Sequence, residues 1–223
     1  MPDGSPTHAL DALQLRKIAT YNFLDHLCRE LDLTETQYQE AKARYEAVGT
    51  WLAYADDPLL TTSVIYAQGS TAIGTNVKPI KSNEHDVDLI ALLPDVKPGM
   101  QPGLAKQLVG DRIRENGRYR PILEEKQRCW RIVYANEFHL DITPSIPNPA
   151  CPNGGELVPD KSLSQWKPSN PKGFRDKFDK RSKLVPSLRV AKSMGRDARA
   201  TASVEPFPVN SGSKGVLRRT VQL

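Results

Sequence analysis

The segment QGSTAIGTNVKPIKSNEHDVDLIALL, residues 68–93, constrains this chain more than any other part of its sequence. It begins with the pair Gly69 and Ser70 and ends in a run that places Asp86 and Asp88 at alternate positions among apolar residues. Side chains alternate along a strand, so the two aspartates project from one face and the apolar residues between them from the other. The segment therefore predicts a turn followed by a strand with two adjacent carboxylates.

This arrangement of residue types points to phosphate and metal chemistry. Two neighbouring carboxylates repel each other when both are ionised, unless a cation lies between them. Mg²⁺ prefers oxygen ligands and is commonly shared between carboxylates and phosphates. Gly69 lets the backbone approach a ligand closely, and successive N–H groups at a turn or helix start bind phosphate. We therefore expect a site for a nucleotide with its metal.

A third carboxylate is predicted from residues 129–147, CWRIVYANEFHLDITPSIP. The pattern indicates two strands joined near residues 135–137, and Asp141 shares the polar face of the second strand with His139 and Thr143. If this strand lies beside the Asp-x-Asp strand, Asp141 joins the first two carboxylates. Three carboxylates can hold two metal ions, which clamp the attacking and leaving oxygens of a phosphoryl transfer.

The histidines and lysines near these carboxylates allow other interpretations. His85 and Asp86 could form the dyad of a metal phosphohydrolase, but that class carries the dyad on helices, whereas the period here is two. We therefore do not expect His85 or His139 to bind a metal. Lys78 and Lys81 lie between the turn and the carboxylates, where they either reach a triphosphate or are simply solvated.

The pair Gly69-Ser70, the Asp86-x-Asp88 motif and the distant Asp141 resemble the DNA polymerase β-like nucleotidyltransferase superfamily. Within it, QGSTAIGT, EHDVDLI and FHLDITPSIP are similar to the bacterial cGAS/DncV-like nucleotidyltransferases, which make cyclic oligonucleotide second messengers in anti-phage defence. WKPSNPKGF and GVLRRTVQL agree with this resemblance, which spans most of residues 10–182. It implies an α+β fold, a polymerase β-like palm with a mixed central sheet and N-terminal helices.

The resemblance also implies roles for the motif residues. The enzyme would use two Mg²⁺ ions to join nucleoside triphosphates, with ATP as an expected substrate. Asp86, Asp88 and Asp141 would be the catalytic and metal-binding residues. The phosphate-binding residues of the turn would be Gln68, Gly69, Ser70 and Thr71. The expected partners are regulatory and effector proteins of a defence system, and a nucleic acid is not required.

Two alternatives stay open at this point. The chain could be an RNA-end or tRNA-end nucleotidyltransferase of the same superfamily. It could also be a nucleotide-binding or RNA-binding module of this fold without turnover. Residues 161–223 are strongly basic and residues 1–160 are acidic, within a total net charge of +5. A basic part facing an acidic site suits a cleft for triphosphates, but it is equally typical of a flexible tail.

Periodicity predicts the order of the elements along the chain. Helices are expected at residues 10–31 and 34–55, the second with a capping box at Thr34 and Gln37. Further helices are expected after the Gly-Ser turn, at 101–117 and at 171–182, whereas 144–159 is predicted to be a loop. The buried stripe of the first helix is predicted to consist of Leu10, Leu13, Ile18, Phe23, Leu24, Leu27 and Leu31.

Composition and local sequence patterns predict the domain organisation and the cellular compartment. We expect a catalytic core at 1–182, a basic linker or mobile loop at 183–215 and the start of a truncated helix at 216–223, so that the C-terminal helical part of the family is largely missing. No apolar run approaches the roughly 20 residues of a membrane helix. Three widely spaced cysteines suggest neither a disulfide framework nor a zinc site, and we expect the cytoplasm as the compartment.

Overall fold

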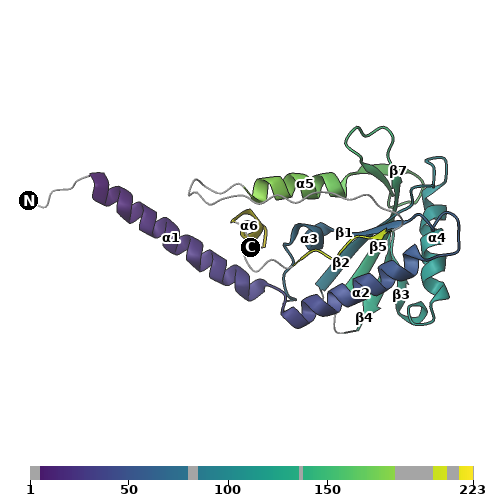
Figure 1. Ribbon diagram of the computed structural model, residues 1–223, viewed down its shortest axis with the longest axis horizontal. Coiled ribbons are helices and arrows are strands. Elements are labelled where there is room, and N and C mark those ends of the chain that lie inside the picture. Colours follow the sequence, from purple (N-terminus) through teal and green to yellow (C-terminus); the bar gives the residue numbers. More distant parts are fainter. Residues whose placement is uncertain (1–5, 80–84, 136–137, 184–202, 210–215, 223) are drawn as a thin grey trace, which may run out of the picture.

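The chain forms a mixed β-sheet with helices on both of its faces, which confirms the predicted α+β class (Figure 1). The computed structural model describes residues 6–79, 85–135, 138–183, 203–209 and 216–222. The helices are α1 (Pro6–Leu31), α2 (Glu35–Ala53), α3 (Gly69–Ile73), α4 (Pro102–Glu115), the 3-10 turn η1 (Arg120–Ile122), α5 (Pro171–Ser182) and α6 (Val216–Gln222).

The strands of the sheet run in both directions. They are β1 (Val64–Gln68), β2 (His85–Leu92), β3 (Leu123–Glu125), β4 (Trp130–Tyr134), β5 (Phe138–Pro147), β6 (Glu156–Pro159), β7 (Trp166–Ser169) and β8 (Ser203–Val204). The main order is β3-β4-β5-β2-β1-β8, and β6 extends from β5 and pairs with β7. Strand β2 is central, antiparallel to β1 and parallel to β5. The Asp-x-Asp strand and the Asp141 strand are therefore direct neighbours, as expected.

The hydrophobic core lies between one face of the sheet and the helices α2 and α4. Strand alternation sends Val87 and Leu89 of β2 into this core together with Leu140 and Ile142 of β5, and all four are fully buried. Burial of each such side chain stabilises the fold by roughly 1.5–3 kcal/mol. The core fixes which face of β2 and β5 points away from α2 and α4, and that face carries the aspartates.

Two helix starts follow the predicted local chemistry. The capping box of α2 is present, because the Thr34 hydroxyl accepts the Gln37 N–H and the Gln37 side chain accepts the Thr34 N–H. Helix α5 begins with Pro171 in its first turn, and the Asn170 side chain accepts the Gly173 N–H at 2.7 Å. The Ser-Asn-Pro-Lys-Gly segment thus acts here as a helix start.

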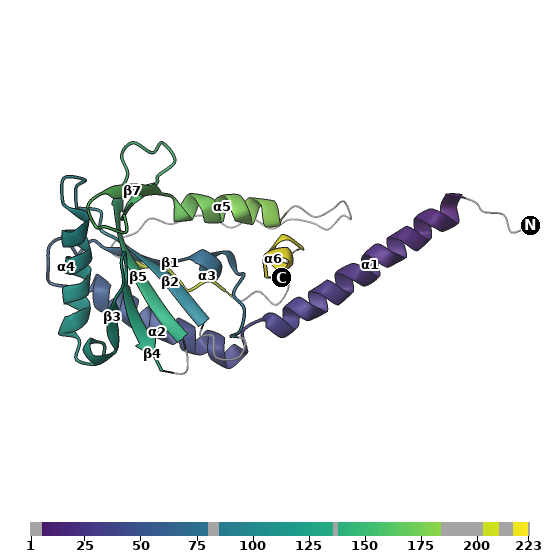
Figure 2. The same ribbon diagram turned by 180° about the vertical axis from the view of Figure 1, so that it is seen from behind.

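The predicted burial of the first helix is wrong over most of its length. Helix α1 extends away from the sheet (Figures 1 and 2), and Leu13, Ile18 and Phe23 are exposed on it. Its C-terminal part contacts α6, where Arg219 pairs with Asp25 at 3.0 Å. The apolar periodicity correctly predicts a helix, but among the described residues no element covers the part of the stripe formed by Leu13, Ile18 and Phe23. None of the helices in the described ranges has the length and apolar character needed to cross a membrane.

Two segments predicted as irregular contain strands. The loop predicted at 144–159 includes the end of β5 and all of β6. The linker predicted at 183–215 includes β8, which pairs in parallel with β1, and Phe207, which packs on Tyr38 and Tyr45. Residues 184–202 and 210–215 of that linker lie outside the described residues. Both strands are short. Strand β8 pairs with β1, which is distant in sequence, whereas β6 lies in a Pro/Asn/Gly-rich segment whose composition favours a loop.

Candidate active site

The Gly-Ser pair lies at a strand-to-helix turn, as predicted, because β1 ends at Gln68 and α3 begins at Gly69. Gly69 has a φ of +61°, a left-handed conformation that favours glycine. A Cβ added to it would lie 2.6 Å from Asp88 Oδ2. Gly69 is therefore required by its backbone angle and by its neighbour, and the turn lies directly against the second aspartate.

The four residues predicted to bind phosphate differ in accessibility. Gly69 is exposed, and Gln68 and Ser70 are partly exposed. Thr71 is only 2% exposed, and its hydroxyl donates to Asn76 Oδ1 at 3.3 Å. The structure therefore presents Gly69 and Ser70 at the surface of the turn and directs the Thr71 hydroxyl into the protein.

A pocket of about 410 Å³ opens beside this turn, between α3 and the start of α5. Phe174 of α5 lines it and is 61% exposed. The other residues that line it include Gln68, Gly69, Ala72, Ile73 and Asn170. The pocket gives a ligand bound at the turn room on the side of α5. Of the two lysines considered from the sequence, Lys78 is partly exposed and Lys81 lies outside the described residues.

The three predicted carboxylates lie on neighbouring strands and one face. Asp88 is directly opposite Asp141 in the parallel β2–β5 pair, and Asp86 is opposite His139. The Asp86 side chain is 56% exposed and the Asp141 side chain 15%. Burial raises the pKa of Asp88 to about 6, and repulsion from Asp141 and Asp86 adds to the effect, while Arg131 opposes it. The shift therefore reflects mainly the burial of Asp88, with a further contribution from the two neighbouring carboxylates.

The guanidinium of Arg131 lies within this carboxylate cluster, and the sequence analysis did not identify it. Arg131 is directly opposite Asp141 in the antiparallel β4–β5 pair. Its Nε and Nη2 donate to the two Asp141 oxygens at 2.7 Å each, and these hydrogen bonds raise the pKa of Arg131. In a hairpin, residues at equal distances from the middle of the connection lie opposite each other. Arg131 and Asp141 are at equal distances, so this rule could have predicted the pair from the sequence.

The donor set fits Mg²⁺ in chemistry, because all three side chains offer hard carboxylate oxygens and Asp88 lies directly opposite Asp141. Among the described residues, however, no three His, Cys, Asp or Glu side chains converge closely enough to hold a metal ion. Both oxygens of Asp141 are hydrogen-bonded to Arg131. The strand register brings the three aspartates together as predicted, but the Asp141 carboxylate is turned to an arginine.

The secondary structure at His85 and Asp86 does not support the dyad of a metal phosphohydrolase. The His-Asp dyad lies at the start of strand β2, and not on a helix as the phosphohydrolase class requires. His139 is on the same face as the aspartates, with Nδ1 at 3.4 Å from both Asp86 Oδ1 and Arg131 Nη1. It therefore lies at the rim of the carboxylate cluster.

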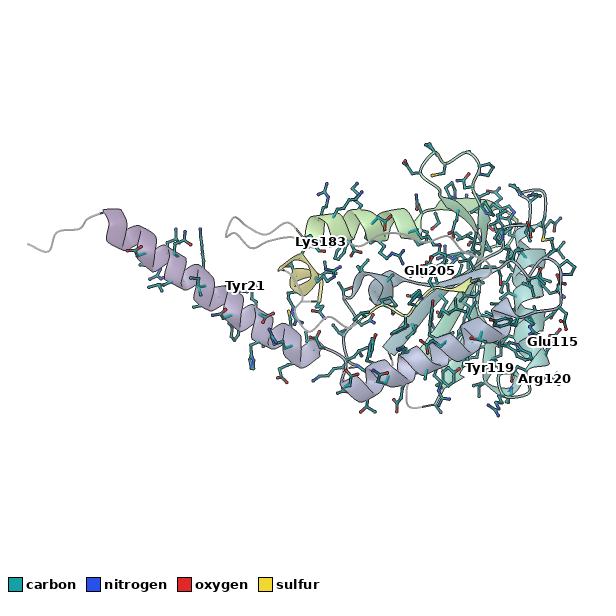
Figure 3. All side chains as sticks on the ribbon, in the orientation of Figure 1. Tyr21, Glu115, Tyr119, Arg120, Lys183 and Glu205 are labelled. Atoms are coloured by element: carbon teal, nitrogen blue, oxygen red, sulfur yellow. The ribbon has the colours of Figure 1, made fainter. Side chains whose placement is uncertain are left out.

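Basic residues of α5 lie above the same face of the sheet, where Figure 3 shows Glu205 between α5 and the strands. Lys172 pairs with Glu205 at 2.6 Å and Arg175 pairs with it at 3.3 Å. The Lys172 ammonium also lies 4.2 Å from the centre of the Tyr66 ring. Two basic side chains of α5 therefore pair with Glu205, which belongs to the same C-terminal part of the chain, and Lys172 also contacts β1 through Tyr66.

A second acidic group on this face was also missed by sequence reasoning. Glu156 of β6 is 4% exposed, and its two oxygens accept hydrogen bonds from the Tyr66 and Ser145 hydroxyls at 2.5 and 2.7 Å. Burial raises the pKa of Tyr66, and the neighbouring Glu156 carboxylate raises it further. Both oxygens of the Glu156 carboxylate are thus hydrogen-bonded within the protein, which joins β6 to β1 and β5.

Comparisons with known proteins agree with the motifs and the fold. Residues 18–182 match the Second Messenger Oligonucleotide or Dinucleotide Synthetase domain family. The chain is 32% identical over 158 residues to the c-di-GMP synthase of Roseivirga ehrenbergii, an alignment that covers 70% of this chain and 42% of that protein. It is 30% identical over 131 residues to the cyclic dinucleotide synthase CdnG of Bradyrhizobium diazoefficiens, covering 55% of this chain and 29% of that protein.

Solved structures share the fold. The structure of the Bradyrhizobium diazoefficiens CdnG in complex with GTP superposes with a TM-score of 0.60 at 25% identity, covering 71% of this chain and 45% of that chain. The Escherichia coli DncV structure in its 3'-deoxy GTP bound form gives a TM-score of 0.51 at 17% identity, covering 70% of this chain and 59% of that chain. The chain spans less than half the length of the curated relatives it matches. The resemblance found in the motifs is confirmed, and the chain belongs to the Second Messenger Oligonucleotide or Dinucleotide Synthetase family.

Proposed function

We propose that this chain carries the catalytic site of a nucleotidyltransferase that joins nucleoside triphosphates into a cyclic dinucleotide. The observation that carries the proposal is the contact between the Gly69 turn and Asp88, with Asp86 beside it and Asp141 on the next strand. This contact places a phosphate-binding turn against a cluster of carboxylates. The names of the related synthases support the same reaction class.

In the proposed reaction, the Gly69 backbone and the Ser70 hydroxyl hold the donor triphosphate. The acceptor hydroxyl oxygen forms a bond to the α-phosphorus while the bond to the leaving pyrophosphate oxygen breaks. Asp141 accepts the proton of the acceptor hydroxyl. Positioning of the two oxygens in line supplies most of the rate enhancement in such a transfer.

Asp86, Asp88 and Asp141 would hold two Mg²⁺ ions. When bound, these ions would neutralise charge on the phosphate oxygens and lower the pKa of the acceptor hydroxyl. The three aspartates would hold the ions next to the Gly69 turn. The strand register that places Asp88 opposite Asp141 supports this assignment, because a bound cation would offset the repulsion between the two carboxylates.

The substrates and partners of the whole protein belong to the same proposal. ATP is the substrate expected from the sequence, whereas a related synthase is named for c-di-GMP and a related structure contains GTP. Both nucleotides are therefore the first to test. Regulatory and effector proteins of a defence system, and the cytoplasm as the compartment, stay predictions.

The proposal is tested by incubating the protein with Mg²⁺ and labelled GTP, ATP or both, followed by phosphatase treatment. Phosphatase-resistant products of dinucleotide size are expected, because a cyclic product has no terminal phosphate. Long ladders on an added RNA would identify an RNA-end nucleotidyltransferase instead. Nucleotide binding without any product would identify a binding module. The variant Asp86→Ala, Asp88→Ala serves as the control that should form nothing.

A further inference from the structure

The Arg131–Asp141 pair is the strongest polar contact in the carboxylate cluster. Both oxygens of Asp141 accept a hydrogen bond from the same guanidinium, at 2.7 Å each. Arg131 Nη2 also lies 3.7 Å from Asp86 Oδ1, so one side chain bridges two of the three aspartates. Bidentate arginine–carboxylate pairs are the strongest hydrogen-bonded ion pairs in proteins.

This pair divides the three aspartates into two groups. Asp86 and Asp88 are adjacent on β2, and Asp86 is mostly exposed to solvent. Asp141 is mostly buried, and both of its oxygens are already occupied by a cation. Asp86 Oδ1 lies only 3.7 Å from Arg131 and 3.4 Å from His139, so a metal ion there displaces no short hydrogen bond. A metal ion at Asp141 must either share its oxygens with the guanidinium, against the repulsion of two cations, or displace a guanidinium nitrogen.

We propose that Arg131 is a positioning residue that holds Asp141 in the metal-free protein and competes with the metal ion that needs Asp141. This inference rests on the proposed function, because it concerns the same metal-binding aspartates. Arg131 therefore makes the two cation sites unequal. The site formed by Asp86 and Asp88 fills first, and the guanidinium beside Asp141 weakens the site that includes Asp141.

The competing interpretation is that Arg131 merely orients Asp141 for the metal and stays in place. The two roles predict opposite effects of removing the guanidinium. If Arg131 competes, its removal tightens binding of the weaker ion. If it only orients, its removal leaves Asp141 free to turn away and weakens binding. Metal binding in the absence of nucleotide therefore separates the two roles without any measurement of turnover.

The test is a Mn²⁺ titration of the protein followed by electron paramagnetic resonance of the free ion. Arg131→Gln should tighten the weaker Mn²⁺ site by roughly fivefold, the size expected for loss of one partly exposed ion pair. Arg131→Lys keeps the charge but loses the bidentate geometry, so it should give a smaller gain. It also provides a variant with a retained charge if Arg131→Gln does not fold without metal.

Two controls make the result specific to Asp141. Arg29→Gln removes an arginine that donates to a carboxylate at the same 2.7 Å distance, but on α1, and it should leave Mn²⁺ binding unchanged. In Arg131→Gln, Asp141→Asn the gain should disappear, because the ligand that Arg131 releases is absent. An equal gain in that double variant would show a general charge effect and overturn the proposal.

The remaining outcomes are also decisive. Unchanged or weaker Mn²⁺ binding by Arg131→Gln, with normal binding by the wild-type protein, would overturn the role of Arg131 alone. No Mn²⁺ binding by either protein would contradict both this inference and the metal part of the proposed function. Tighter binding that depends on Asp141 would support both.

Discussion

Two acidic groups, Glu156 and the three aspartates, lie on the same face of the sheet but have different surroundings. Glu156 receives two hydroxyl hydrogen bonds from Tyr66 and Ser145 and is almost inaccessible to solvent. Asp88 faces the carboxylates of Asp86 and Asp141, and burial with their repulsion raises its pKa to about 6. A carboxylate supplied with neutral donors stabilises the fold, whereas carboxylates gathered together lower stability until a cation binds.

The difference assigns a structural role to Glu156 and a ligand-binding role to the aspartates. Strand alternation places Tyr66 and Ser145 on the face that also carries Asp88 and Asp141. Glu156 and the aspartates therefore share one surface, and neither exposure nor strand position alone distinguishes their roles. Their hydrogen-bond partners distinguish them, and the following variants test this difference.

The largest effect is expected for Asp86→Ala, Asp88→Ala. Product formation should fall by on the order of 10³-fold or more, because charge stabilisation at the transferring phosphate is lost. The fold should persist, since both substitutions remove repulsion and neither residue contributes to the hydrophobic core. Phosphatase-resistant product and the thermal unfolding midpoint are measured together. Turnover close to that of the wild-type protein would contradict the assignment.

Glu156→Ala should instead act on stability. The substitution leaves the Tyr66 and Ser145 hydroxyls buried without their acceptor, which costs about 3 kcal/mol of unfolding free energy. Urea denaturation gives this value. Glu115→Ala is the control, because Glu115 is an exposed residue paired with Arg112, and its loss should change stability by less than about 0.5 kcal/mol. Equal effects of the two variants would show that the buried network is not stabilising.

The raised pKa of Asp88 predicts a pH dependence of stability. Asp88 has a folded pKa of about 6 against an ordinary value of 3.8, so between these values the folded state binds the additional proton. Without metal, the unfolding free energy should therefore fall as pH rises from 4 to 7, by about 2 kcal/mol from this group. Asp88→Asn should remove this component, and the exposed control Asp56→Asn should retain it. An identical pH profile for Asp88→Asn would contradict the electrostatic description.

Ser70→Ala should have the smallest effect. One hydroxyl hydrogen bond to the triphosphate is lost while the backbone donors of the turn remain, so GTP or ATP binding should weaken by about 1 kcal/mol. Isothermal titration with each nucleotide measures the change. Ser164→Ala, on the surface away from the turn, is the matched control. The assignment of the turn fails if both variants bind nucleotide as tightly as the wild-type protein.

The carboxylate site was predictable because the local sequence pattern determines which face of its strand each aspartate occupies. The period of two around Asp86 and Asp88 fixed their common face, and the buried core behind β2 confirms that register. The position of Asp141 followed from the same rule on β5. The family motifs then indicated that the two strands are neighbours, which alternation alone cannot establish.

The parts that were missed depend on distant or unfavourable contacts. The Tyr66–Glu156 hydrogen bond joins residues 90 positions apart, and no periodicity reports such a contact. Arg131 is an exception, because it belongs to a local hairpin whose register places it opposite Asp141. The exposed stripe of α1 shows another limit of sequence analysis. Apolar periodicity predicts a helix, but it does not predict whether another element covers the apolar stripe.

Metal binding tests the comparison between the two acidic groups most directly. Mn²⁺ is titrated by calorimetry into the wild-type protein, Asp88→Asn and Glu156→Gln under the same conditions. The account predicts that Glu156→Gln binds Mn²⁺ like the wild-type protein, whereas Asp88→Asn loses most of the binding because it removes a ligand shared by both ions. Retained binding by Asp88→Asn, or loss of binding in Glu156→Gln, would contradict the account.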